Sequence, residues 1–218
     1  MVIFDCNGVL VDSETIVAEV AAQELSRAGF PLTPEHVTHY FSGRRSSDML
    51  AEIETAYQKA LPPNFATFIN AMTLQRLRAE VRATRHADYA LTWLRGPKCV
   101  ASSSTFERIR VSLEVTGLLR FFEPNLFSAS EVTRGKPAPD LFLYAAGKMN
   151  VKPSDCVVVE DSAAGVAAAH AAGMIPIGFA GGNCAPFNHE QLLVKAGARA
   201  VIADMRQLKG TVTALRGW

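Results

Sequence analysis

From about residue 97 onward, short apolar runs alternate with stretches of helical periodicity, and this alternation restricts the chain to few folds. The apolar runs span residues 99–101, 126–127, 156–159, 175–177 and 200–203. Helical periodicity lies between them, at about 105–116, 139–149, 162–172 and 188–196. Strand–helix alternation predicts a parallel, doubly wound sheet, which is a Rossmann-like α/β core. The run 156–159 lacks polar alternation, so both of its faces should be covered.

The first residues of the chain add one more strand to this core. Residues 1–4 are apolar, and the run ends in the carboxylate of Asp5 with Gly8 close behind. A buried strand that delivers a reactive side chain at its carboxyl end is a common way to build an active site. We therefore expect Asp5 to be functional.

A helical block interrupts the α/β pattern after this strand. Ser13 is placed to cap a helix whose apolar positions repeat every 3.6 residues as far as Gly29. Further helical periodicity spans 34–40, 46–60 and 64–83, and no convincing strand occurs from 30 to 84. We expect an α/β core domain of residues 1–13 and 85–218 and an inserted, all-helical cap domain of residues 14–84.

Composition excludes several classes of function. The net charge of +1 over 218 residues gives no basic stripe for a nucleic acid and no charged face for a membrane surface. No apolar run approaches the roughly 20 residues of a spanning helix, and Asp5 and Asp12 interrupt the N-terminal stretch, unlike in a signal peptide. The cysteines lack CxxC spacing and are expected to be reduced core residues, so a cytoplasmic protein is expected. They are Cys6, Cys99, Cys156 and Cys184.

Polar residues follow three of the apolar runs. The first run ends at Asp5, the next at Ser102-Ser103-Ser104, and the run 156–159 at Glu160-Asp161-Ser162. Because the carboxyl ends of parallel strands share one edge of the sheet, these groups should converge. A single strand end of this kind is usually an ordinary helix cap. Three of them, together with Gly-Lys-Pro-Ala-Pro-Asp at 135–140, indicate a functional site.

In their order and spacing, these segments resemble the motifs of haloacid dehalogenase-like hydrolases. The N-terminal motif Asp-x-Asp-Gly-x-Leu-x-Asp-Ser is matched through Asp12-Ser13, except that its second aspartate is Asn7. The resemblance extends over nearly the whole chain and is nearest to the helical-cap subgroup that holds β-phosphoglucomutases and sugar-phosphate phosphatases. It implies that Asp5 is a nucleophile, and that Ser102 and Lys136 hold the phosphoryl group.

The charges of these segments call for a cation. Asp5, Glu160 and Asp161 carry −3 together and Lys136 adds only +1, so a phosphate dianion would be repelled. A divalent cation removes that repulsion, and hard oxygen ligands suit Mg²⁺. The resemblance implies that Asp5, Asp161 and the backbone carbonyl of Asn7 are metal ligands, with Glu160 acting directly or through water.

The substrate-binding residues are expected on both sides of the site. Backbone N–H groups near Gly8 and the side chain of Ser103 extend the phosphate site of the core. In the helical block, a polar loop holds Gly43, Arg44 and Arg45, and Glu14 lies just past the first motif. Arginine suits an anionic or hydroxyl-rich sugar. The competing interpretation is a solvated turn with a helix cap at Ser46 or Ser47.

Asn7 determines how active the protein should be. By resemblance, an aspartate at this position protonates the leaving alkoxide and later activates water, and an amide cannot exchange that proton near pH 7. General acid–base catalysis contributes about 10²–10⁴-fold, so we expect binding to persist while turnover suffers.

The leading hypothesis is therefore a Mg²⁺-dependent phosphatase of small phosphorylated metabolites such as sugar or polyol phosphates. Three alternatives remain: a hexose-phosphate mutase, a haloacid dehalogenase and a non-catalytic binder of a phosphorylated ligand. The acidic pair Glu160-Asp161 argues against the dehalogenase, whose reaction needs no metal. Nothing in the sequence indicates the oligomeric state.

Overall fold

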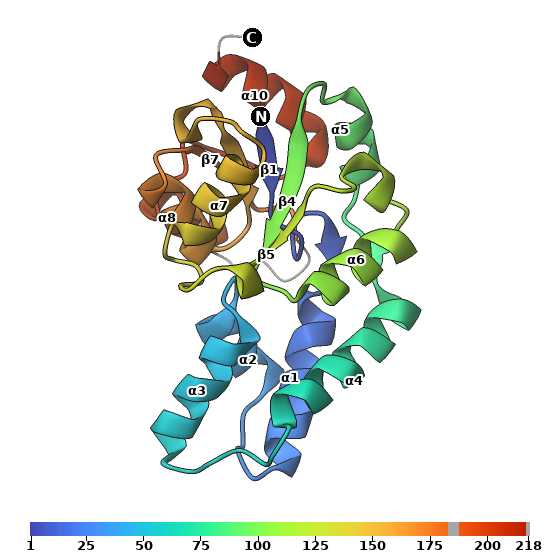
Figure 1. The fold of residues 1–218 in the computed structure, drawn as a ribbon, viewed down its shortest axis with the longest axis vertical. Coiled ribbons are helices and arrows are strands. Elements are labelled where there is room, and N and C mark those ends of the chain that lie inside the picture. Colours follow the sequence, from blue (N-terminus) through green and yellow to red (C-terminus); the bar gives the residue numbers. More distant parts are fainter. Residues whose placement is uncertain (183–187, 217–218) are drawn as a thin grey trace.

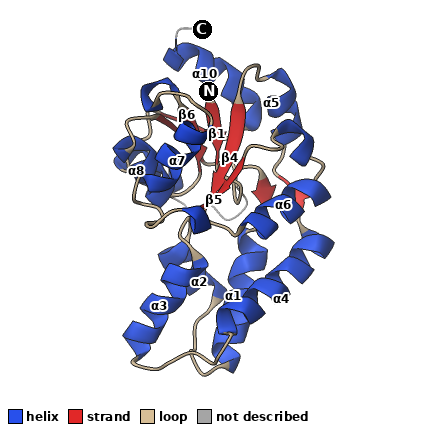
Figure 2. Ribbon diagram, viewed as in Figure 1, coloured by secondary structure: helices blue, strands red, loops and turns tan. Residues whose placement is uncertain are grey.

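A six-stranded parallel sheet forms the centre of the upper part of the molecule (Figures 1 and 2). The computed structural model describes residues 1–182 and 188–216. The strand order is β5-β4-β1-β6-β7-β8, so the order reverses at β1, where ligands bind in open α/β sheets. This sheet confirms the predicted doubly wound α/β core. Its strands are β1 Val2–Phe4, β4 Lys98–Ser102, β5 Leu126–Ser128, β6 Val157–Glu160, β7 Ile175–Phe179 and β8 Ala200–Ile202.

Helices cover both faces of this sheet. Along β1, Val2 and Phe4 point into one apolar cluster, which also includes residues of α5, α6 and α10, whereas Ile3 points into a second cluster with residues of α7 and α8. The residues of β6 are buried throughout, as the lack of polar alternation predicts. The helices of the core are α5 Ala87–Trp93, α6 Phe106–Val115, α7 Asp140–Lys148, α8 Ala163–Ala171, α9 His189–Lys195 and α10 Leu208–Arg216. Short 3₁₀ turns are Leu119–Phe121, Ala129–Glu131, Pro153–Asp155 and Met205–Gln207.

The remaining helices form a bundle at the carboxyl edge of the sheet, in the lower half of Figure 1. They are α1 Glu14–Arg27, α2 Pro34–Phe41, α3 Ser46–Tyr57 and α4 Phe65–Glu80. This bundle has its own apolar core, which includes Leu25, Phe30 and Ile53. The expected domain boundaries at 13/14 and 84/85 stay a prediction, because Ile16 of α1 and Leu77 of α4 still pack into the core beside the sheet.

Two short strands lie where the chain enters and leaves the helical block. Strand β2, Val11–Asp12, pairs in antiparallel fashion with β3, Arg82–Ala83. The expectation that residues 30–84 hold no strand is therefore wrong at β3. A strand of two residues is too short to produce an alternating pattern in the sequence.

Three details of the helices also differ from expectation. Helices α5 and α10 are additional helices, which lie outside the stretches that periodicity predicts to be helical. Helix α3 ends at Tyr57 rather than near residue 60, because Gln58 adopts the left-handed conformation with φ of 49°.

Within residues 1–182 and 188–216, no helix is both long and apolar enough to cross a membrane.

Ser13 does not cap α1, contrary to the sequence-based expectation. It occupies the N-cap position, but its φ of −113° and ψ of −11° are helical, and its side chain makes no capping bond. A capping hydroxyl needs an extended backbone to reach the free N–H groups of the first turn. The Ser13 Oγ is instead buried without a partner among the described residues.

The cysteines whose structure is described are buried thiols. Cys6, Cys99 and Cys156 are unpaired, and burial raises the pKa of each thiol. They are therefore protonated and unreactive at neutral pH, as expected of core residues. Cys184 lies outside the described residues.

Candidate active site

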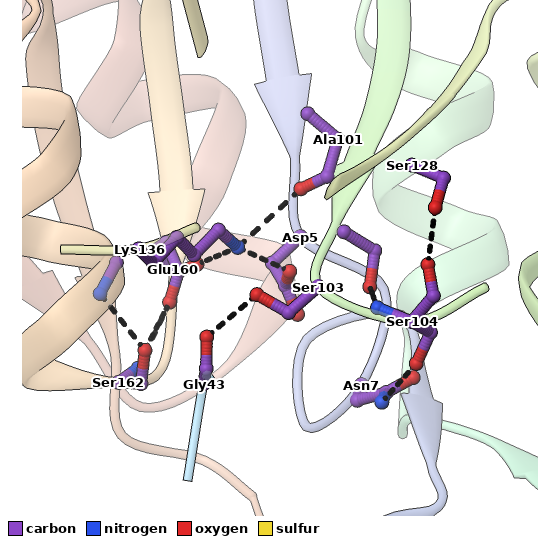
Figure 3. A network of polar contacts seen from close by, with 12 residues as sticks. Asp5, Asn7, Gly43, Ala101, Ser103, Ser104, Ser128, Lys136, Glu160 and Ser162 are labelled. Carbon is purple, nitrogen blue, oxygen red and sulfur yellow. Dashed lines mark hydrogen bonds and ion pairs between the residues drawn. The ribbon is translucent and has the colours of Figure 1, made fainter. Parts of the chain in front are cut away.

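Three adjacent strand ends bring the predicted site residues together. Asp5 directly follows β1, Ser102 ends β4 and Glu160 ends β6, and β1 lies between the other two strands. The Asp5 amide donates to the Val159 carbonyl at 3.0 Å, so the sheet ladder fixes its backbone as well. The sheet therefore places these segments, separated in sequence by up to 155 positions, at one edge (Figure 3).

Lys136 forms the centre of a buried network at this edge. Its Nζ donates to Asp5 Oδ1 at 2.5 Å, to Glu160 Oε1 and to the Ala101 carbonyl at 3.4 Å (Figure 3). Burial lowers the pKa of this ammonium group, but the two carboxylates outweigh burial and raise the pKa overall. The ammonium group is therefore charged, and it fixes the orientation of the Asp5 carboxylate.

Glu160 joins this network to a helix. Its Oε2 accepts hydrogen bonds from the Ser162 amide at 3.0 Å and from Ser162 Oγ at 2.9 Å, and Ser162 caps α8 by accepting from the Gly165 amide. A Cβ on Gly165 would lie 2.0 Å from the Glu160 carboxyl group, so only glycine fits there. Both Glu160 oxygens are thus engaged by the protein, which favours a role in positioning Lys136.

Asp161 and Asp5 are the carboxylates with capacity left for a metal ion. A Cβ on Gly8 would lie 2.0 Å from Asp161 Oδ2, so the glycine lets this carboxylate approach the first loop. Burial, followed by repulsion from Glu14, Glu160 and Asp5, raises the pKa of Asp161 well above its ordinary value. Burial likewise raises the pKa of Asp5 to about 7, although Lys136 opposes the shift.

The donor set fits Mg²⁺. No cluster of three or more His, Cys, Asp or Glu side chains suited to a metal occurs in the described part of the chain. Two carboxylates with carbonyl, water and phosphate oxygens are nevertheless how Mg²⁺ is commonly held. Burial is the main cause of the raised pKa of Asp5 and of Asp161, and repulsion from neighbouring carboxylates adds to it; a bound divalent cation would relieve that repulsion.

The Asn7 side chain lies among the serines that follow β4. Its Nδ2 donates to Ser104 Oγ at 2.9 Å, and the Ser104 amide donates to Ser102 Oγ at 3.3 Å (Figure 3). Ser128 Oγ in turn donates to the Ser104 carbonyl at 2.7 Å. These bonds fix the serine loop and direct the Asn7 amide toward Ser104.

The polar loop of the helical block contacts the core through Gly43 and Arg45. Ser103 Oγ donates to the Gly43 carbonyl at 2.7 Å. The Arg45 Nη1 donates to the carbonyls of Val132 and Thr133 at 3.2 Å each, while its other nitrogens bind Asp48. These contacts hold the helical block against the sheet edge.

A cavity lies between the helical block and the core. Its lining includes Asp5, Asn7, Glu14, Arg44, Ser102 and Asp161. Lys136 and Glu160 are buried and are not part of the lining, and Arg45 contacts the core loop instead. Arg44 is held by a bidentate ion pair with Glu52, and Glu14 accepts from Ser42 Oγ at 2.9 Å. The expected substrate roles of these cap residues stay predictions.

The cavity also holds a residue that the motifs do not reveal. Arg108, in the first turns of α6, lines the cavity although it is only 4% exposed. A signal exists in the sequence, because Arg108 precedes Ile109 and stands four residues before Ser112, on a helix face that is buried. A charged residue on a buried face is unusual unless it has a partner.

Known proteins share this chain's sequence and fold. A family model described as haloacid dehalogenase-like hydrolase matches residues 1–173. The 6-phosphogluconate phosphatase of Escherichia coli K12 is 32% identical over 174 residues, which cover 79% of each chain. Hexitol phosphatase A of the same organism is 31% identical and covers 78% of each chain. A solved haloacid dehalogenase-like protein of unknown function from Agrobacterium tumefaciens is 36% identical, with a TM-score of 0.82 over 98% of this chain and 97% of that one.

Proposed function

Because the chain belongs to the haloacid dehalogenase-like hydrolases, we propose that it is a Mg²⁺-dependent phosphatase of small phosphorylated metabolites, namely sugar or polyol phosphates. The observation that carries this proposal is the Asp5 carboxylate. It lies at the end of the central strand, is oriented by the charged Lys136 and faces the cavity under the helical block. A preorganised carboxylate beside a fixed cation suits nucleophilic attack on a phosphate ester.

In this proposal the Ser102 hydroxyl binds a phosphoryl oxygen, and the buried Lys136 ammonium, which is bonded to Asp5, offsets the negative charge of the site. An Asp5 oxygen forms a bond to phosphorus as the bond to the leaving alkoxide breaks, which gives an aspartyl phosphate. Water then displaces the carboxylate, so inorganic phosphate is released and Asp5 is regenerated. Asp5 and Asp161 would hold Mg²⁺, which supplies further neutralisation of the phosphoryl charge.

Asn7 accounts for the weak turnover that we expect. Its amide donates to Ser104 Oγ and carries no proton that it can exchange near neutral pH. The alkoxide must therefore leave without a protein acid, and the attacking water lacks a protein base.

The decisive experiment is phosphate release from a panel of sugar and polyol phosphates, with and without Mg²⁺. We expect Mg²⁺-dependent release that Asp5→Asn reduces on the order of 10⁴-fold or more. Asp88→Asn on the outer helix α5 is the matched control and should retain activity. Release that survives Asp5→Asn would contradict the assignment of the nucleophile. No release from any phosphate ester would favour the non-catalytic binder.

A hexose-phosphate mutase is the second candidate, because the contacts of Gly43 and Arg45 hold the helical block over the site. A mutase must exclude water from the phosphorylated enzyme, and a closed cap does this. Conversion of one hexose phosphate into its isomer, followed by ³¹P NMR, separates the two reactions.

A further inference from the structure

Arg108 is a buried cation that has no anionic partner in the described part of the chain. Its Nη1 contacts only the Ser46 hydroxyl of the helical block, at 3.4 Å, and its Nε is buried without a partner among the described residues. No ion pair joins it to a carboxylate within residues 1–182 and 188–216, and burial lowers the pKa of the guanidinium to about 10. The group is still charged at neutral pH.

The contrast with Lys136 shows why this arrangement needs an explanation. Lys136 is equally buried, and two carboxylates balance its charge. A buried charge without a partner is strongly destabilising, and a buried polar atom left unsatisfied points to a missing ligand. Arg108 lines the same cavity as Asp5 and Asn7, so a molecule bound at Asp5 is within the same space.

We propose that Arg108 binds a carboxylate at the far end of the substrate, which makes phosphorylated sugar acids the preferred substrate class. The inference rests on the proposed function, because it takes the cavity above Asp5 to be the substrate site. The planar guanidinium matches a carboxylate with two parallel hydrogen bonds. Its contact with Ser46 would join the bound acid group to the start of α3.

A single negative charge fits this end of the cavity better than a second phosphate. Arg44, the other arginine of the lining, is already paired with Glu52. Glu14 adds a carboxyl group to the same lining, and Asp161 is assigned to the metal in the proposed function. One unpaired cation among these carboxylates balances a monoanion, whereas a second phosphate dianion would leave a net repulsion.

The test compares two ligands that share a six-carbon skeleton, 6-phosphogluconate and glucitol 6-phosphate, which differ in a carboxylate against a hydroxymethyl group. Calorimetry with Mg²⁺ on freshly prepared protein measures both affinities. We expect 6-phosphogluconate to bind about 10- to 150-fold more tightly, as a charge-assisted contact warrants. Fructose 1,6-bisphosphate tests whether Arg108 binds a second phosphate instead, and it should bind more weakly than 6-phosphogluconate.

Variants then assign the preference to Arg108. In Arg108→Gln the affinity ratio should fall toward 1, and in Arg108→Lys it should be intermediate, because the charge remains without the planar fork. Arg110→Gln, an exposed neighbour on α6 that pairs with Glu123, is the control and should keep the full ratio. If Arg108→Gln does not fold, Arg108→Lys carries the comparison.

The outcomes also separate this inference from the proposed function. Equal binding of the acid and the polyol, binding of neither, or a ratio that survives substitution of Arg108 would overturn the inference. Phosphate release from both ligands with equal kcat/KM would support the proposed phosphatase function but contradict the preference for the acid. Tighter binding of the acid without any phosphate release would support the role of Arg108 in binding a carboxylate and would contradict the proposed phosphatase function.

Discussion

The edge of the sheet and the loop of the helical block that faces it are held in different ways. In the network at the sheet edge, the side chains of Lys136 and Glu160 are fully buried and that of Asp5 is 7% exposed. In the loop, the ion pair of Arg45 and Asp48 is 20% and 31% exposed. Breaking a buried pair costs several kcal/mol, whereas an exposed pair contributes about 0–1 kcal/mol.

This difference indicates how the two regions divide the work. The groups proposed to react are fixed before any ligand arrives, because removing one of them leaves a buried charge unpaired. Besides the apolar packing of Ile16 and Leu77 against the core, the helical block is held at the sheet edge by partly exposed polar contacts. Its closure can therefore respond to a ligand, and the contacts that close it should affect binding more than chemistry.

The largest effect should come from restoring an acid at the sheet edge. Asn7→Asp should raise phosphate release from alkyl phosphates by about 10²–10⁴-fold, because the alkoxide leaving group regains a proton donor. Ser104 Oγ can donate to the new carboxylate in place of accepting from the amide, so the serine loop should be preserved. Steady-state rates on alkyl and aryl phosphates measure the gain.

Aryl phosphates supply the contrast, since their leaving groups depart without protonation. The first step should gain less for them, and the unchanged chain should accumulate phospho-Asp5, visible by intact mass. Fresh protein is needed, because Asn7-Gly8 is prone to deamidation. Unchanged rates on every ester, with Mg²⁺ still bound, would rule out the impaired-phosphatase explanation.

The next effect concerns the two carboxylates that are available to a metal. At a hundred times its Kd, Mg²⁺ should stabilise the protein by about 2.7 kcal/mol, which is roughly 5–10 °C in Tm. Asp161→Asn should remove most of this shift, whereas Asp155→Asn, at the far end of β6, should retain it. A shift unchanged by Asp161→Asn would place the metal elsewhere.

The same shift should depend on pH. At pH values between 3.8, the ordinary pKa of an aspartate, and about 7, the Asp5 carboxyl group is more protonated in the folded protein than in the unfolded chain. The metal-free protein therefore loses stability as pH rises through this range. Protons compete with Mg²⁺ below pH 7, so the increase in Tm should be larger at pH 8 than at pH 6. Melting curves with a chelator and with Mg²⁺ at both pH values test this.

The smallest effect should come from the loop of the helical block. Arg45→Gln removes the bonds to the Val132 and Thr133 carbonyls, so closure should weaken and KM for a sugar phosphate should rise about 5- to 10-fold. This is less than a buried charge-assisted bond contributes, because the Arg45 side chain is partly exposed. Arg44→Gln, whose guanidinium is held by Glu52, should change KM less than about 5-fold. If the two variants raised KM for an aryl phosphate as much as KM for the sugar phosphate, neither arginine would act through closure.

The sequence predicts the sheet and the residues at its edge because both follow from local patterns. Apolar runs give the strands, and parallel strands present their ends at one edge, so Asp5, Ser102 and Glu160 had to lie near one another. The direction in which Glu160 points is different, since it depends on Lys136, 24 positions earlier in the chain. No local pattern contains that information.

The helical block shows the same limit more strongly. The sequence indicates a polar loop with two arginines, but Arg45 binds core carbonyls 87 and 88 positions away, while Arg44 turns to Glu52. Arg108 escapes motif analysis because its importance lies in what it lacks, an anionic partner. These assignments depend on how the block docks on the core, which periodicity and capping do not determine.

The pairing of β2 with β3 has a consequence for how such a molecule can change. Val11 lies opposite Ala83, so the two ends of the helical block leave the core one strand spacing apart, about 5 Å. A tight turn of a few residues could bridge that gap, and so could another block of any length that starts and ends side by side. The core can thus exchange its helical block as a unit while the strands that carry Asp5 and Ser102 stay in register.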